Sequence, residues 1–293
     1  MIRASLDANA VQASIFVTPG KGLVFQRRST TGGTSISTSG PGYGAPVWLR
    51  LTKIGYTVTA WYRKNTTDLW TTLGSQFMGA LPAGGTVYVG IPVTSHDTGR
   101  LATATFSNLL IAPLRTWSCS VIGNTNSQCA QDGTVMTMTN VGADIWGTSD
   151  QFVFGWNQME GDGTITARVR NVQNTNAWTK AGVMIRGDWR FANSAYVDLV
   201  VTPAKGVVMQ YRSVAGGVSA QIGTLPGVAP GWVRLTRSVN TFTGEWSTDG
   251  VTWKLVGTQT VNLPLDAFAG MAVTSHDTSH GATASFDDMR IQQ

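Results

Sequence analysis

The chain has 293 residues, of which 42% are apolar and only 13% are charged, and its formal net charge is +5. Its basic residues are spread singly, which argues against a nucleic-acid partner, and no run of 18 apolar residues predicts a membrane span. Glu occurs twice, whereas Gly, Thr, Ser and Val dominate, and this mixture favours strands and turns over surface helices. We therefore expect an all-β protein.

Two stretches of the chain repeat one another. The run Met1-Ile2-Arg3 returns as Met184-Ile185-Arg186, and Val93 to Thr98 returns as Val273 to Thr278. The stretch that begins at residue 114 and leads to the second start occurs once. The order is therefore half, unique segment, half, and we predict two domains, residues 1–113 and 114–293.

The first half, taken in order, predicts short strands separated by turns. Residues 12–18, the turn Gly20-Lys21-Gly22 and residues 23–28 predict a hairpin. Further strands are predicted at residues 47–54, 56–62, 70–77, 87–93 and 101–111. Pro92 lies within one of them, and because proline cannot donate to a strand ladder, this strand should lie at an edge or be interrupted.

The unique segment predicts strands at residues 134–139, 151–156 and 164–172, and the second half then repeats the first. Two cysteines, Cys119 and Cys129, are close enough in sequence to close a short loop. A disulfide between them fits a secreted protein, and two buried free thiols fit almost as well. We take the disulfide as the hypothesis to test.

Four runs carry a resemblance to a known family. They are residues 142–147, 161–169, 180–186 and 273–276. Together they resemble a bacterial extracellular module of the concanavalin A-like lectin/glucanase superfamily, of the kind called a "regulation of enolase"-type domain. The resemblance covers residues 117–293 as a complete module and residues 1–113 as a module without its first third. It implies an antiparallel jelly-roll β-sandwich, an extracellular location, and attachment to secreted carbohydrate-active enzymes.

The predicted strands suggest a ligand-binding face. In the predicted strands of the second half, alternate side chains should point away from the apolar core. These are Arg186, Asp198, Gln210, Arg212, Trp232, Arg234, Glu245 and His276. Trp48, Arg50 and His96 hold matching positions in the first half. If these strands share a sheet, the face offers aromatic rings and planar donors to a polysaccharide. The alternative is a solvated outer face on which arginine stems lie over tryptophans.

Several carboxylates and histidines have two interpretations each. Asp144 and Asp150 flank a Gly-rich loop and, with Asp287, could bind a structural calcium ion or simply cap their loops. His96 and His276 follow Thr-Ser at a strand end, where a turn, a ligand contact or a metal site are the alternatives. No other cofactor is expected, because no phosphate loop or dinucleotide fingerprint is present.

Catalysis is the runner-up to carbohydrate binding. A glucanase of this fold needs two carboxylates, and the only candidates are Glu245 with Asp198 or Asp162. A structural or adhesive spacer is the third hypothesis. Met1 is not followed by a signal-peptide pattern, so we expect an upstream part, such as a catalytic domain. The open edge of residues 1–113 could alternatively drive self-association.

Overall fold

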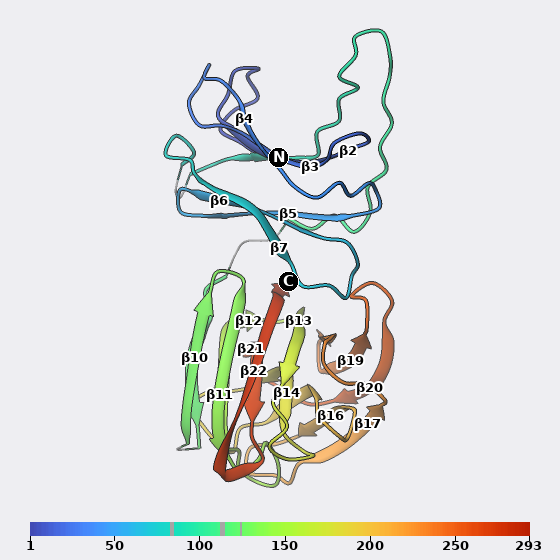
Figure 1. Cartoon of the computed structure of the whole chain (residues 1–293). Helices are drawn as coiled ribbons and strands as arrows, with labels where there is room; N and C mark the ends of the chain where they lie inside the picture. Colours follow the sequence, from blue (N-terminus) through green and yellow to red (C-terminus); the bar gives the residue numbers. More distant parts are fainter. Residues whose placement is uncertain (83–84, 112–114, 124) are drawn as a thin grey trace. The chain divides into compact units, whose positions relative to one another are not determined.

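The computed structural model describes residues 1–82, 85–111, 115–123 and 125–293, in two compact units, Met1–Leu114 (unit 1) and Arg115–Gln293 (unit 2). The described residues form 22 strands and no helix (Figure 1). The all-β prediction is therefore confirmed. Within this part of the chain there is accordingly no helix that could cross a membrane.

Unit 2 is a sandwich of two seven-stranded antiparallel sheets. The first, which we call the β14 sheet, has the order β17-β16-β15-β14-β21-β12-β9. Its strands are β17 (Ala220–Leu225), β16 (Val207–Arg212), β15 (Tyr196–Val201), β14 (Lys180–Arg186), β21 (Asp266–Thr274), β12 (Phe152–Glu160) and β9 (Ser118–Ile122). Strands distant in sequence are neighbours here, as in a jelly roll, because β21 lies between β14 and β12.

The second sheet, which we call the β18 sheet, has the order β10-β11-β22-β13-β18-β19-β20. Its strands are β10 (Asn126–Asp132), β11 (Val135–Gly142), β22 (Asp277–Gln292), β13 (Gly163–Val172), β18 (Gly231–Ser238), β19 (Thr241–Ser247) and β20 (Lys254–Thr260). Alternate residues of the two sheets fill the space between them, among them Val197, Leu199, Val233, Leu235 and Phe286, all with no exposed surface. Period-2 alternation therefore gives each strand one face in the core.

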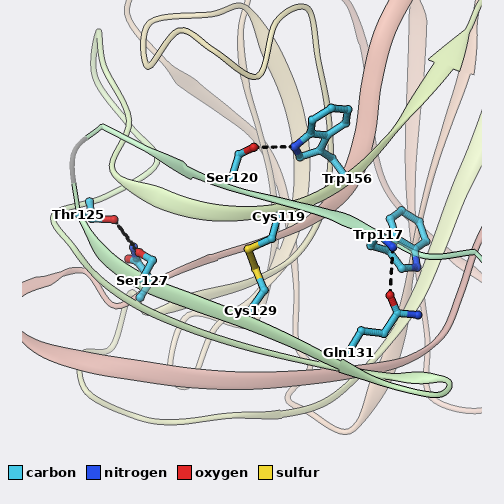
Figure 2. The surroundings of a disulfide bond; sticks show 9 residues. Trp117, Cys119, Ser120, Thr125, Ser127, Cys129, Gln131 and Trp156 are labelled. Carbon is cyan, nitrogen blue, oxygen red and sulfur yellow. Dashed lines mark hydrogen bonds between the residues drawn. A yellow bond between two sulfur atoms is a disulfide. The ribbon is translucent and has the colours of Figure 1, made fainter.

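A disulfide joins the two sheets of unit 2 at one edge. Cys119 lies on β9 of the β14 sheet and Cys129 on β10 of the β18 sheet, with their Cα atoms 6.2 Å apart (Figure 2). Beside it, Trp156 donates its indole N–H to the Ser120 hydroxyl at 2.9 Å. The disulfide hypothesis is confirmed, and the bond links two edge strands that are not hydrogen-bonded to one another.

Unit 1 is a smaller sandwich. Its five-stranded sheet has the order β4-β3-β2-β1-β8, and its three-stranded sheet the order β5-β6-β7. The strands are β1 (Ile2–Arg3), β2 (Gln12–Thr18), β3 (Gly22–Arg28), β4 (Ile36–Ser39), β5 (Trp48–Ile54), β6 (Thr57–Arg63), β7 (Thr71–Phe77) and β8 (Tyr88–Val89). Phe25, Ala60 and Met78 belong to its small buried core.

One sequence-based prediction fails in unit 1. Strands were expected at residues 87–93 and 101–111, yet only Tyr88 and Val89 form one, and residues 90–111, all of them described, form none. The interruption near Pro92 is as expected, but the second strand is missing altogether. The reason is that strands need partners, and the described residues of unit 1 contain no counterpart of β11, β12 or β13 to supply them.

Candidate functional site

The predicted single polar face of unit 2 is wrong, because its residues lie on two different sheets. Arg186, Asp198, Gln210 and Arg212 lie on the β14 sheet, whereas Trp232, Arg234 and Glu245 lie on the β18 sheet. Their neighbours in sequence fill the core between the sheets, so these side chains point away from one another on opposite outer faces. Parity within a strand gave the correct orientation, but it does not say to which sheet a strand belongs.

The outer face of the β14 sheet is covered by the chain itself. Ile145 packs with Phe152, Phe154, Met184 and Tyr196 in a second apolar cluster on this face. Tyr196 donates its hydroxyl to Ser219 at 3.1 Å, and burial raises its pKa well above the usual range. The segment from residue 143 to 151, which we call the covering loop, therefore belongs to the folded structure of the sheet.

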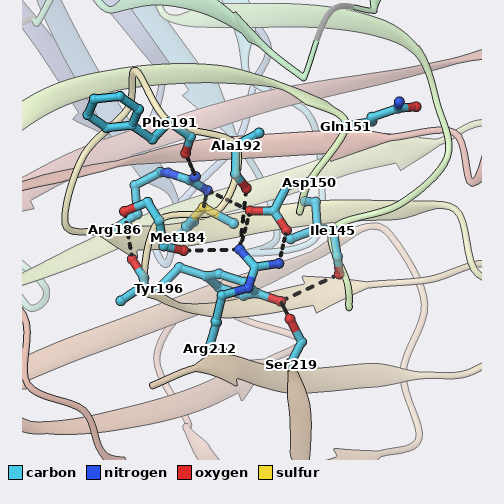
Figure 3. Close-up of polar contacts among 12 residues, drawn as sticks. Ile145, Asp150, Gln151, Met184, Arg186, Phe191, Ala192, Tyr196, Arg212 and Ser219 are labelled. Carbon is cyan, nitrogen blue, oxygen red and sulfur yellow. Dashed lines mark hydrogen bonds and ion pairs between the residues drawn. The ribbon is translucent and has the colours of Figure 1, made fainter. Parts of the chain in front are cut away.

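Two arginines of the predicted ligand face hold this covering loop. Asp150 accepts hydrogen bonds from Arg212 Nη2 at 2.6 Å and Nη1 at 2.9 Å, and from Arg186 Nη1 at 3.1 Å (Figure 3). All three side chains are fully buried. Burial lowers the pKa of the Arg186 guanidinium, and the Asp150 carboxylate opposes that shift. Arg186 and Arg212 are therefore structural cations, and in this arrangement they cannot reach a ligand.

The outer end of the covering loop carries a second charged group. Lys180 lies on β14 with 1% of its side chain exposed, and its Nζ lies 2.6 Å from Asp144 Oδ1 and 2.9 Å from the Ile145 carbonyl oxygen. His276 Nδ1 lies 3.2 Å from the other Asp144 oxygen, Oδ2. Lys180 thus holds Asp144 and His276 only lies close to it, while 20% of the Asp144 side chain and 30% of that of His276 stay exposed.

An open hollow of about 310 Å³ lies beside this carboxylate. It is lined by Ala143, Asp144, Trp146, Gly147, Ser149 and Gln151. Trp146 is 37% exposed, and the Lys180 ammonium lies 5.5 Å from the centre of its ring. The hollow therefore combines an accessible indole, a fixed carboxylate, a hydroxyl and an amide on one short loop.

A second hollow of the same volume lacks such a ring. It is lined by Arg170, Asn171, Val172, Asn174, Thr202, Pro203, Val228 and Ala229. Without an aromatic platform it is the weaker candidate for a sugar ring.

Asp198 is a buried carboxylate beneath the same face. It pairs across the strands with Gln210, and neither of its oxygens nor Gln210 Oε1 has a hydrogen-bond partner among the described residues. Burial raises the pKa of Asp198 to about 8, against the opposing charge of Lys180. The side chain therefore carries its proton at neutral pH, and at 0% exposure it cannot contact a ligand in this arrangement.

The outer face of the β18 sheet fits the alternative of arginines lying over tryptophans. Arg234 stacks on Trp253 at 4.0 Å and pairs with Glu245 at 2.7 Å, while the Arg168 guanidinium lies 4.7 Å from the Trp232 ring. Trp232 was predicted to stack on a sugar, but only 2% of it is exposed, so it cannot do so in this arrangement.

The corresponding residues of unit 1 lie in a similar arrangement. Arg50 stacks at 3.9 Å on Trp70, and Trp48 lies 5.0 Å from the Arg63 guanidinium. Both histidines lie in turns with positive φ, 58° at His96 and 55° at His276, but His96 is exposed and His276 is partly buried. In both turns it is the preceding serine, Ser95 or Ser275, that hydrogen-bonds the backbone, so the histidine itself is not the capping residue.

The predicted calcium ligands are not brought together. Asp150 is bound to two arginines, Asp144 lies beside Lys180 and His276, and Asp287 lies 3.8 Å from Arg170 on the other sheet. Across the described residues, no group of three or more His, Cys, Asp or Glu side chains is placed to hold a metal ion.

The alternative catalytic carboxylates are also separated. Glu245 and Asp198 lie on opposite outer faces, and Asp162 accepts the Val239 backbone N–H in the turn between β12 and β13. A glycosidase needs its two carboxylates on either side of one bond, and Glu245 and Asp198, on opposite outer faces, do not meet this requirement.

Sequence analysis missed the residues that form the hollow. Trp146 and Lys180 were not singled out, and Asp144 was considered only for calcium binding or loop capping. The available signal was the single tryptophan within the Gly-rich run from Gly142 to Gly147, next to an aspartate.

Comparison with known proteins supports the fold and leaves the family open. No family model and no curated protein matches the chain. Among solved structures, a functionally unknown protein from Saccharomyces cerevisiae aligns with 62% of this chain and 98% of its own, at 16% identity and a TM-score of 0.50. The carbohydrate-binding module CBM66 from Bacillus subtilis aligns with 63% of this chain and 100% of its own (15% identity, TM-score 0.43). A GH43 protein from Bacillus licheniformis aligns with 96% of this chain and 62% of its own, at 11% identity and a TM-score of 0.42. The predicted β-sandwich class is confirmed, and the resemblance to "regulation of enolase"-type modules stays a prediction.

Proposed function

We propose that unit 2 binds a neutral glycan in the hollow on the covering loop, with Trp146 as the platform for a sugar ring. The observation that carries this proposal is the pairing of an exposed indole with a fixed, partly exposed carboxylate on one loop. Carbohydrate sites need a flat apolar surface for the ring and fixed polar groups for its hydroxyls. Trp146 and Asp144 supply one of each.

The carboxylate is suited to accept sugar hydroxyls. Lys180 holds one oxygen of Asp144 from the buried side, and His276 approaches the other. The positive charge of Lys180 balances that of Asp144, so the local pair favours a neutral ligand over a charged one. Ser149 and Gln151 at the rim add a hydroxyl and an amide.

The covering loop needs little ordering when a ligand binds. Its far end is held by the buried Asp150 pairs with Arg186 and Arg212, and its middle by Lys180 at the Ile145 carbonyl. A binding site that is already ordered loses less conformational entropy on association. The arginines of the predicted face thus support the site from beneath without touching the glycan.

The test is retention on a panel of insoluble neutral polysaccharides, followed by calorimetry with oligosaccharides of any polysaccharide that retains the protein. Trp146→Ala and Asp144→Asn should each weaken binding at least tenfold, as expected of central contacts. Arg234→Ala, on the opposite outer face, is the matched control and should bind like the wild type. Wild-type affinity in Trp146→Ala, or equal loss in the control, would refute this placement.

We also propose that the protein works in an oxidising, extracellular compartment, which the Cys119–Cys129 disulfide supports. Its partner there is a polysaccharide. A hydrolytic role has no support in the described residues, because the candidate carboxylates are separated. Reducing-sugar release that Glu245→Gln abolishes would restore the catalytic alternative.

A further inference from the structure

Residues 90–111 of unit 1 have the sequence of two strands and the exposure of a surface loop. The matching stretch of unit 2, residues 270–291, forms most of β21 and β22. Phe106 is 51% and Ile111 64% exposed, whereas their counterparts Phe286 and Ile291 are 0% and 6% exposed. Val93 is 50% exposed, and Val273 is fully buried.

The strands that unit 1 does possess pair in the same register as those of unit 2. Ile2 pairs with Ala13 and Val89, as Ile185 pairs with Val197 and Ala269. Further along, Trp48 pairs with Arg63 as Trp232 pairs with Ser247. The two units therefore share one pairing scheme over these strands, apart from a bulge in the β16–β17 pair that the β3–β4 pair lacks.

Local conformation is also preserved where the strands are absent. In unit 1 the Ser95 hydroxyl donates to the Asp97 carbonyl at 2.6 Å, and Asp97 Oδ1 accepts the Gly99 N–H at 2.8 Å. In unit 2, Ser275 makes the same bond to Asp277, also at 2.6 Å, and the Asp277 carboxylate accepts the Ser279 N–H. The turn forms by itself, but the strands on either side of it need neighbours.

Unit 2 shows which neighbours these are. Phe286 of β22 lies between Met136 of β11 and Val169 of β13, and Val273 of β21 lies between Val153 of β12 and Ala181 of β14. Every one of these partners comes from the stretch 115–183, which occurs once in the chain. Where the structure describes unit 1, it has the acceptor strands of the same module without these donor strands.

We propose that residues 90–111 are a strand-accepting edge whose occupant is a polypeptide segment with the sequence pattern of residues 115–183. Backbone groups at an open edge are a template for added strands. A one-residue slip would turn the apolar side chains outward, so the alternation in residues 101–111 selects a donor of matching pattern. The completed unit 1 is a second sandwich in which Phe106 and Ile111 are buried.

The experiment adds a second copy of residues 115–183 in front of Met1 of the full chain. Val183 of the added copy then precedes Met1-Ile2-Arg3 just as Val183 precedes Met184-Ile185-Arg186. Hydrogen exchange of residues 90–111 should slow at least tenfold relative to the unextended chain, and dye binding to exposed apolar surface should fall. The control extension carries Val169→Asp, which places a charge at a core position, and should give no protection.

Register is tested by a designed disulfide. The Thr139 and Thr283 hydroxyls of unit 2 are hydrogen-bonded at 2.9 Å, and Thr103 is the counterpart of Thr283. Thr139→Cys in the added copy should therefore cross-link to Thr103→Cys, and far more slowly to Thr105→Cys, two positions away. Equal cross-linking to both would refute the register.

Three results would overturn the proposal. One is unchanged hydrogen exchange of residues 90–111 in an extended chain in which the designed Thr139→Cys and Thr103→Cys pair has formed its disulfide. The second is protection of these residues in the unextended chain by dimerisation, seen as a doubled mass in solution, because the occupant would then be a second copy. The third is a loss of stability on Phe106→Ser that is equally large in the unextended chain, because this side chain would then already be packed.

Discussion

Arg212 and Asp150 form a two-point ion pair, with 2.6 Å and 2.9 Å between their atoms and no exposed surface on either side chain. This pair determines what the outer face of the β14 sheet can do, because it ties the covering loop down on strands that otherwise look like a binding face. Arg186 adds a third charge to the same carboxylate.

Replacing Asp150 should be strongly destabilising. Asp150→Asn leaves two buried arginines without their counter-charge, and breaking a buried pair in this way costs about 3–5 kcal/mol. Urea unfolding should show this loss. Glu245→Gln is the control, because the Arg234–Glu245 pair is partly exposed and such pairs contribute at most about 1 kcal/mol. Similar losses in both variants would contradict a special role for Asp150.

Asp198 should make stability depend on pH. Its pKa is about 8 in the folded state and 3.8 ordinarily, so the folded state holds the proton more tightly than the unfolded state. The stabilisation of the folded state by protonated Asp198 is complete below pH 3.8 and is lost as pH rises through about 8. The free energy of unfolding falls by up to about 1.4 kcal/mol per pH unit in this range. Asp198→Asn should flatten the unfolding free energy between pH 5 and pH 8. An exposed-site control, Asp266→Asn, should leave the wild-type slope unchanged, and the same slope in Asp198→Asn would show that another group titrates.

The disulfide should stabilise unit 2 measurably. Closing a loop of this size contributes about 2–3 kcal/mol, mainly by restricting the unfolded chain. Cys119→Ser with Cys129→Ser should lower the unfolding free energy of unit 2 by that amount and leave the pairing of its other strands intact. Thiol titration of the unfolded, unreduced protein should find no free thiol, and two thiols would contradict the bond.

Asp249 should hold the turn between β19 and β20. Burial acts to raise its pKa, but hydrogen bonds from the Thr252 and Val251 backbone outweigh it and lower the pKa to about 2. The stabilisation is present above the ordinary value of 3.8 and is lost as pH falls through about 2. Asp249→Ala should cost about 1–2 kcal/mol near neutral pH, and the gap to wild type should close in acid. A gap at pH 2 as large as that at neutral pH would point to packing rather than charge.

Local signals in the sequence predicted the strands well. The hairpin of β2 and β3 was predicted from one turn and its flanking alternation, and it is found at those residues. These features depend on a few neighbouring residues, which the sequence displays directly. The order of strands in a sheet depends on contacts over a hundred residues apart, such as Thr139 with Thr283, and a single sequence does not display those.

The candidate site was harder to predict for the same reason. Arg186 and Arg212 have the composition of a ligand face, and only their pairing with Asp150, 36 and 62 residues away, shows that the loop covers them. Trp232 was assigned to an accessible face, although it is covered by packing against Arg168. Residues 101–111 have a strand pattern, but a pattern describes one side of a ladder and not whether the other side is present.

The bond between Cys119 and Cys129 also affects how unit 2 would respond to a protease. A single cut between the two cysteines would leave both pieces covalently joined, so the cleaved protein would keep its full mass until a reducing agent is added. Each piece would stay paired to its own sheet, β9 to β12 and β10 to β11. Electrophoresis without a reducing agent would therefore not reveal damage to this edge, and the nicked molecule would stay in one piece in the compartment where we propose it works.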